Sequence, residues 1–261
     1  MAYQINEQPT ISSILYYYDK GNCISLNFSE NFLLVLKKYG YDNITNIELG
    51  KYKIVNGLLK DYVVRYKKKE LSVIDLKSEM FRWMNDDEIS YISFVNKKNR
   101  SWVWDITWYK NYTMPSGISV SDYSFNHLSI VTSYERLNNK ECQIKYVELF
   151  CELSDLFEAF YGRIEDVSTA VDILDRTKEK VFNPKYIQTV YWGNYFGQCC
   201  YSEREHKNIS LLPDCYIKRT TKGVFFSLTD DIYDSKDHPD YNRRKKIYKH
   251  LTKYFFTASK T

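Results

Sequence analysis

Apolar and polar residues alternate in several short stretches of the chain, and this period of two residues predicts β-strands. The clearest case is residues 101–109, where Trp102, Trp104, Ile106 and Trp108 fall on one face. Three tryptophans on one face predict a sheet surface packed under a helix; the alternative is an exposed aromatic platform for a partner. Further strands are predicted at 14–18, 23–28, 61–66, 71–76, 89–95, 127–134, 186–192, 215–220 and 223–229.

A period near 3.6 residues predicts helices elsewhere in the chain. Ser29 is the expected cap of a helix that ends at Gly40, and the longest helical pattern covers 141–160 and stops at Gly162. Two more helices are predicted, one from about Val167 and a closing one from about Pro239. Because strands and helices follow no regular βαβ order, the predicted class is α+β, with a mixed, mainly antiparallel sheet or sheets and helices packed on one face.

The polar, turn-rich segment 111–126 is the best candidate for a boundary within the chain. A chain of 261 residues can bury most of its apolar surface without disulfides, so we expect one domain spanning 1–261. The polar segment divides this domain into two candidate lobes of similar size, 1–115 and 125–261.

Composition and charge argue against nucleic-acid and membrane partners. Aromatic residues make up 17% of the chain, which can mark a stacking surface but also follows from an AT-rich genome, the reading we favour. The formal net charge is only +4, and the basic runs at 67–69, 97–100 and 243–246 are short and broken by nearby acids. They are typical of solvated faces, so we do not expect nucleic-acid binding. No apolar run approaches the ~20 residues that span a bilayer, and residues 1–20 are polar, without the apolar segment of a secretion signal. We therefore expect a cytoplasmic protein with reduced cysteines and no membrane partner.

The sequence contains no recognised catalytic or cofactor motif: no phosphate-binding glycine loop, no nucleophile elbow and no zinc-spaced Cys and His set. A thiol-dependent hydrolase can be drawn from Cys199 or Cys200, with His206 as base and Glu203 or Glu205 to orient it. Sequence proximity alone does not establish that geometry, and a solvated loop at 202–208 is the simpler interpretation. We therefore expect no enzymatic activity, no cofactor and no metal.

One short motif does resemble a known family. The residues Trp192, Gly193, Asn194, Tyr195, Phe196 and Gly197 resemble the Trp-x-Asn-aromatic-hydrophobic-Gly segment of bacterial immunity proteins of the type VI immunity group and the related immunity protein 52 family. The surrounding order is also similar: Tyr161-Gly162-Arg163 upstream, then Leu211-Leu212-Pro213, a strand opened by Gly223 and the Pro239-Asp240-Tyr241 entry to a closing helix. The resemblance covers about residues 127–256, and the glycine pair that often follows the motif is replaced here by Cys199 and its neighbours.

The resemblance implies a non-catalytic protein that binds and neutralises a cognate protein toxin of a polymorphic toxin system, acting as a monomer or homodimer. Acidic residues that would suit a basic toxin active site occur in two clusters: Asp86, Asp87 and Glu88, and Asp230, Asp231, Asp234 and Asp237. The alternatives are a phage or mobile-element protein that inhibits a host defence factor, and the thiol hydrolase.

We expect the motif itself to be structural. Tyr191 and Trp192 would end a central strand, and Gly193 would permit close approach of a neighbouring backbone. Asn194 would bond the backbone at a turn in which Gly197 adopts a positive φ.

Overall fold

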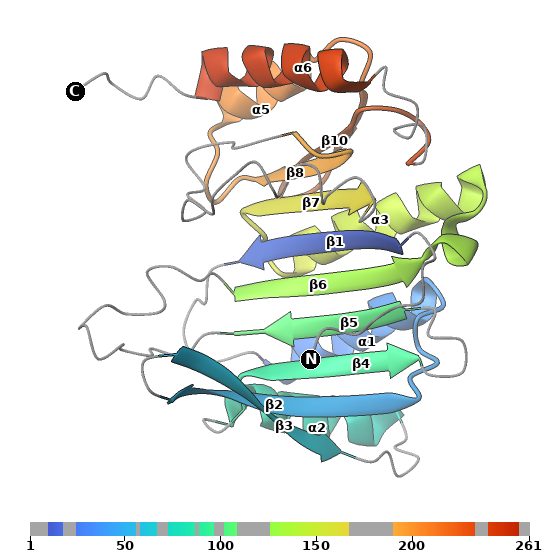
Figure 1. The fold of residues 1–261 in the computed structure, drawn as a ribbon, viewed down its shortest axis with the longest axis vertical. Coiled ribbons are helices and arrows are strands. Elements are labelled where there is room, and N and C mark those ends of the chain that lie inside the picture. Colours follow the sequence, from blue (N-terminus) through green and yellow to red (C-terminus); the bar gives the residue numbers. More distant parts are fainter. Residues whose placement is uncertain are drawn as a thin grey trace.

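The computed structural model describes residues 10–17, 25–55, 58–66, 73–86, 89–96, 102–108, 126–166, 190–232 and 240–255. Ten strands form one sheet in the order β3-β2-β4-β5-β6-β1-β7-β8-β10-β9, and every pairing is antiparallel (Figure 1). The predicted α+β class with a mainly antiparallel sheet is confirmed.

The strands are β1 Thr10–Tyr17, β2 Asn46–Val55, β3 Leu58–Tyr66, β4 Tyr91–Asn96, β5 Trp102–Thr107, β6 Asn126–Ser133, β7 Tyr161–Asp166, β8 Gly193–Gly197, β9 Tyr216–Arg219 and β10 Gly223–Ser227. The α-helices are α1 Leu26–Lys38, α2 Val73–Asn85, α3 Lys140–Leu156, α5 Glu203–Ile209 and α6 Asp240–Phe255, and a short 3-10 helix, η2, covers Tyr134–Leu137.

The first strand of the chain lies in the middle of the sheet. β1 pairs with β6 on one side and with β7 on the other, so a segment from the first candidate lobe is enclosed by two strands of the second. One continuous sheet therefore runs through both candidate lobes, 1–115 and 125–261. The expectation of one domain over 1–261, with these two segments as candidate lobes, stays a prediction.

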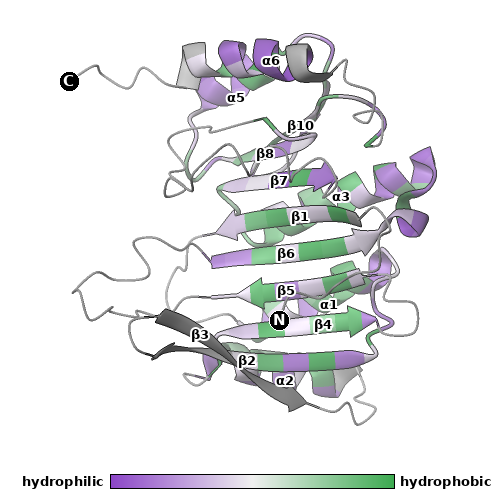
Figure 2. Cartoon of the chain, in the orientation of Figure 1, coloured by the Kyte–Doolittle hydropathy of each residue, from purple (hydrophilic) through white to green (hydrophobic). Residues whose placement is uncertain are grey.

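One face of the sheet carries the apolar core. Helices α1, α2 and α3 lie behind the sheet in Figure 1, and along β6 the residues alternate between buried and half-buried. Trp102, Trp104 and Trp108 point to the helical side and are at most 4% exposed. Phe32 of α1 meets the Trp104 ring edge-on at 6.0 Å. The prediction of a sheet face packed under a helix is confirmed, and Figure 2 shows the apolar residues concentrated in this central layer, whereas α6 is mostly hydrophilic.

Several element predictions are wrong in their type or bounds. Residues 26–28 of the strand predicted at 23–28 belong to α1, which is capped by Ser25 through a 3.1 Å bond from the Phe28 amide to its hydroxyl; Ser29 lies inside the helix. Residues 73–76 of the strand predicted at 71–76 are instead the start of α2, and 71–72 lie outside the described residues. Its buried residues Leu76, Met80, Trp83 and Met84 recur at helical spacing, and this longer stripe outweighs the local β-branched pair.

The longest helix also ends earlier than predicted. α3 stops at Leu156, and Gly162 does not end it but lies within β7. The helix predicted from Val167 falls on residues 167–189, outside those described. Among the described residues, no helix is long and apolar enough to cross a membrane.

Candidate partner-binding surface

The motif at residues 191–197 forms β8 and the two residues before it. The strand predicted at 186–192 lies instead at Gly193–Gly197; residues 190–192 are not in a strand, and 186–189 lie outside the described residues. Tyr195 and Phe196 are fully buried on opposite faces, because α3 covers one side and the segment leading into α5 covers the other. A strand buried on both faces shows no polar alternation, which explains why the pattern missed it.

Asn194 and the two glycines act inside this strand and not at a turn. The Asn194 side chain accepts the Tyr191 amide at 3.1 Å and donates to the Tyr191 carbonyl at 2.8 Å, so the predicted backbone bonding is confirmed. The predicted positive φ at Gly197 is wrong, since Gly40 is the glycine with positive φ in the described chain. A Cβ on Gly197 would lie 1.9 Å from the Ala159 carbonyl oxygen, whereas one on Gly193 would meet the Phe225 ring at 3.0 Å. The close backbone approach therefore occurs at Gly197.

A buried ion pair fastens α6 to the motif. Arg244 donates to both carboxylate oxygens of Glu165, at 3.1 and 3.2 Å, and to the Val190 carbonyl at 3.2 Å. Glu165 also accepts the Trp192 amide at 3.0 Å. The side chains are 15% and 4% exposed, so Arg244 does not point outward as the sequence predicted.

A short helix follows the motif where we expected a solvated loop. Ser202 caps α5 with a capping box: its hydroxyl accepts the Glu205 amide at 3.3 Å, and the Glu205 carboxylate accepts the Ser202 amide at 2.6 Å. His206 and Ile209 of α5 are buried. Glu203, Arg204 and Lys207 are exposed on its other side.

The hairpin of β9 and β10 is held from the other face by α3. The predicted strands at 215–220 and 223–229 are confirmed, joined by a turn at Thr221 and Lys222. One carboxylate, Asp155, accepts the Thr220 hydroxyl at 2.6 Å, the Thr221 amide at 2.8 Å, the Lys222 amide at 3.2 Å and the Tyr195 hydroxyl at 3.0 Å. The edge of the sheet at β9 is thereby fixed relative to α3.

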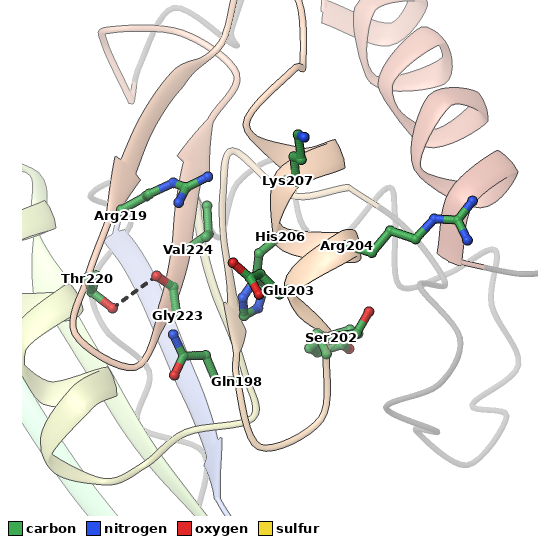
Figure 3. A pocket seen from close by; sticks show the side chains of 11 residues that line it. Gln198, Ser202, Glu203, Arg204, His206, Lys207, Arg219, Thr220, Gly223 and Val224 are labelled. Atoms are coloured by element: carbon green, nitrogen blue, oxygen red, sulfur yellow. Dashed lines mark hydrogen bonds between the residues drawn. The ribbon is translucent and has the colours of Figure 1, made fainter.

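A groove of about 820 Å³ separates α5 from this hairpin, and we call it the α5 groove. Gln198, Ser202, Glu203, His206 and Lys207 line it on one side, and Arg219, Gly223 and Val224 on the other (Figure 3). Figure 3 shows Arg219 and Lys207 near one end of the groove and Gln198 near the other, with Arg204 extending away from β9 toward α6.

The charges of the α5 groove are unbalanced. No carboxylate among the described residues pairs with Arg204, Lys207 or Arg219; Arg219 makes one 3.3 Å bond, to the Ser210 hydroxyl. Glu203 is the single acid among the residues that line this groove. The carboxylate of the neighbouring Glu205 is engaged in the capping box. The groove is therefore a net cationic surface that suits an anionic group. Sequence spacing does not predict this cluster of cations, since their proximity depends on the register of β9.

His206 lies at the inner wall of the α5 groove. Its side chain is 5% exposed, and its Nε2 has no hydrogen-bond partner. Burial lowers the pKa of His206, while the nearby Glu205 carboxylate opposes that shift. Burial therefore favours the neutral form of the ring over the charged form.

The two thiols proposed as nucleophiles are exposed, and the Cys199 thiol donates to the Glu158 carbonyl at 3.6 Å. His206 Nε2 makes no hydrogen bond, so it is bonded to neither Cys199 nor Cys200. The thiol-hydrolase alternative stays a prediction. Elsewhere, burial raises the pKa of Cys151 to about 12, which keeps that thiol protonated at neutral pH.

The acidic candidates are dispersed. Asp86, at the end of α2, and Asp230, just after β10, lie toward opposite ends of the sheet (Figure 1). Asp230 forms an exposed ion pair with Lys140 at 3.3 Å, and Asp231 accepts the Gln143 amide at 3.0 Å. The remaining candidates, Asp87, Glu88, Asp234 and Asp237, lie outside the described residues, so a toxin-binding role for the two clusters stays a prediction. Within the described ranges, no group of three or more His, Cys, Asp and Glu residues could hold a metal ion.

Comparison with known proteins reveals a similarity of fold. No family model matches the sequence, and no curated protein matches it. The fold is similar to that of a solved structure described as "Pseudomonas aeruginosa T6SS protein PA0821", with a TM-score of 0.54 over 95% of this chain and 72% of that chain, at 15% identity. At this identity, the similarity establishes a shared fold.

Proposed function

We propose that the protein is a non-catalytic immunity protein associated with type VI secretion, which binds a cognate toxin and blocks it. The observation that carries the proposal is the fold similarity over 95% of the chain to a protein described as a T6SS protein. The resemblance of residues 192–197 to the immunity-protein motif supports it independently, because that motif was identified from the sequence alone.

The physical character of the surface also supports a binding role. A protein that occludes a partner needs a preformed surface with uncompensated charge and aromatic or arginine anchors. The α5 groove has such a surface: its walls are fixed by the capping box of α5 and by the Asp155 bonds to the hairpin, and its three cations have no carboxylate partners. We place the contact with the toxin at this groove.

The test is co-expression with the protein encoded by the adjacent gene in a bacterial host. We expect the neighbour alone to arrest growth and the pair to restore it. Growth arrest that is equal with and without this protein, or a neighbour that is harmless, contradicts the proposal. An unrelated protein expressed at the same level serves as the control.

The stoichiometry of protection separates binding from catalysis. An occluding protein protects only when it is at least equimolar with the toxin, whereas an enzyme that destroys a toxin or reverses its damage protects when substoichiometric. Titration of purified protein into an assay of the toxin should therefore give inhibition that saturates near a 1:1 ratio. Complete protection at a small fraction of that ratio would refute the non-catalytic mechanism.

A further inference from the structure

Among the described strands, β9 is the last in the sheet, and no described strand pairs with its outer side. It pairs with β10 alone, from Tyr216 opposite Ser227 to Arg219 opposite Val224. The Thr220 amide donates to the Gly223 carbonyl at 2.9 Å and closes the hairpin. Because backbone groups alternate in direction along a strand, Tyr216 and Lys218 bond toward β10, while Ile217 and Arg219 direct their N–H and C=O groups outward. No described residue bonds these outward groups.

Each face of this edge is bordered by a hollow. On the α5 side lies the α5 groove, which includes Arg219. On the α3 side lies a second hollow of about 630 Å³, which includes Lys218 and Glu148; Arg219 borders this hollow too, but its guanidinium bonds the Ser210 hydroxyl at the end of α5. Side chains of an added strand would alternate between the two faces, so the hollows offer room for both sets.

The two hollows differ in charge. On the α5 side, Arg219 and Lys207 have no carboxylate partner. On the α3 side, Lys38 already pairs with Glu152 at 2.6 Å, and Lys218 is accompanied by an unpaired Glu148. Acidic side chains are therefore favoured on the α5 face, while the α3 face has no such preference.

We propose that β9 receives an extended, acidic segment of a partner protein as an added strand, with acidic side chains at alternate positions directed toward Arg219 and Lys207. Main-chain bonds to Ile217 and Arg219 supply affinity, and the cations select the segment. Where the partner is the toxin, the inference rests on the proposed function.

The main-chain contribution is tested by one substitution and its matched control. Ile217→Pro removes an outward N–H without removing a bond to β10, and Ile217→Ala removes the same side chain but keeps that N–H. We expect Ile217→Pro to bind the neighbouring-gene toxin roughly tenfold more weakly than Ile217→Ala, the loss of about one hydrogen bond. Equal affinities, with both variants folded by circular dichroism, would overturn strand addition.

The charge contribution is tested by the double variant Lys207→Glu/Arg219→Glu. The two introduced carboxylates should repel the acidic segment and weaken toxin binding roughly 100-fold. The control is Lys249→Glu, on an exposed position of α6, which lies on the far side of α5 from β9. We expect the control to bind like the wild type. Loss of binding in the control as well, or retention in the double variant, would contradict the assignment. Self-association of the double variant with unchanged toxin binding would show that the cations only protect the edge from aggregation.

A peptide probe keeps the inference testable if the neighbour proves harmless. A synthetic peptide of alternating Glu and Val should slow hydrogen exchange at the Ile217 and Arg219 amides, which are open in the free protein, and leave Lys218 unchanged. A Lys and Val peptide of equal length should not. If co-expression does not restore growth but the acidic peptide slows exchange at these amides, the immunity function alone is refuted. If the protein neutralises the toxin but neither the toxin nor the acidic peptide slows exchange at these amides, strand addition at β9 is refuted.

Discussion

Replacing Arg244 by methionine should destabilise the protein by about 3–5 kcal/mol. The change keeps an unbranched side chain of similar length but removes two bonds to Glu165 and one to the Val190 carbonyl. Glu165 is 4% exposed at its side chain, so its charge cannot recover solvation by a small movement. The Trp192 amide, at 3.0 Å, still donates to the Glu165 carboxylate, but this donor is neutral and does not replace the lost charge of Arg244.

Urea unfolding followed by tryptophan fluorescence measures this effect, since the chain has five tryptophans. The matched control is Arg204→Met, an exposed arginine without a described partner, for which we expect a change within about 0.5 kcal/mol. Adding Glu165→Gln to Arg244→Met should recover part of the loss, because the buried charge is then absent. A cost below about 1 kcal/mol for Arg244→Met would refute the reasoning and place the pair among screened surface contacts.

Two further predictions concern the walls of the α5 groove. Asp155→Ala removes the acceptor of four hydrogen bonds. At about 1 kcal/mol for each bond, with partial recovery by water, it should lower the free energy of unfolding in urea by about 2–4 kcal/mol. An unchanged unfolding midpoint would contradict the role of Asp155 in holding the hairpin. His206 has a pKa lowered by burial, so its unfolded form binds a proton more readily than its folded form. Its contribution to stability is therefore present above the ordinary histidine pKa, near 6.5, and is lost as the pH falls through that value. Between pH 7.5 and 5, the wild type should lose more stability than His206→Gln, by at most ~2 kcal/mol; equal losses in the two proteins would show that the ring titrates normally.

Local sequence signals predicted the elements whose partners are close in the chain. The hairpin of β9 and β10 was found because a two-residue turn joins two apolar runs. The buried face of β5 was found because tryptophans at alternate positions need a covering layer. In both cases the pattern that predicts the element lies within a few neighbouring residues, although the ring that covers Trp104 comes from Phe32 of α1.

The remaining elements depend on distant partners. β8 is buried on both faces by segments that precede and follow it, so its residues carry no alternating pattern. The α5 groove combines Lys207 of a helix with Arg219 of a strand, and sequence spacing does not tell which face of the strand Arg219 occupies. The fold also separates residues that look alike in the sequence. Asp86 and Asp230 both lie in short acidic clusters but are found toward opposite ends of the sheet.

The position of β1 between β6 and β7 has a consequence for the order of folding. Residues 10–17 cannot pair with β6 until the chain has been synthesised as far as Ser133. They cannot pair with β7 on the other side until it has reached Asp166. Closing so long a loop carries an entropic cost before any contact compensates for it. We therefore expect slow folding, and a fragment ending near residue 115 should leave β1 without a sheet to join.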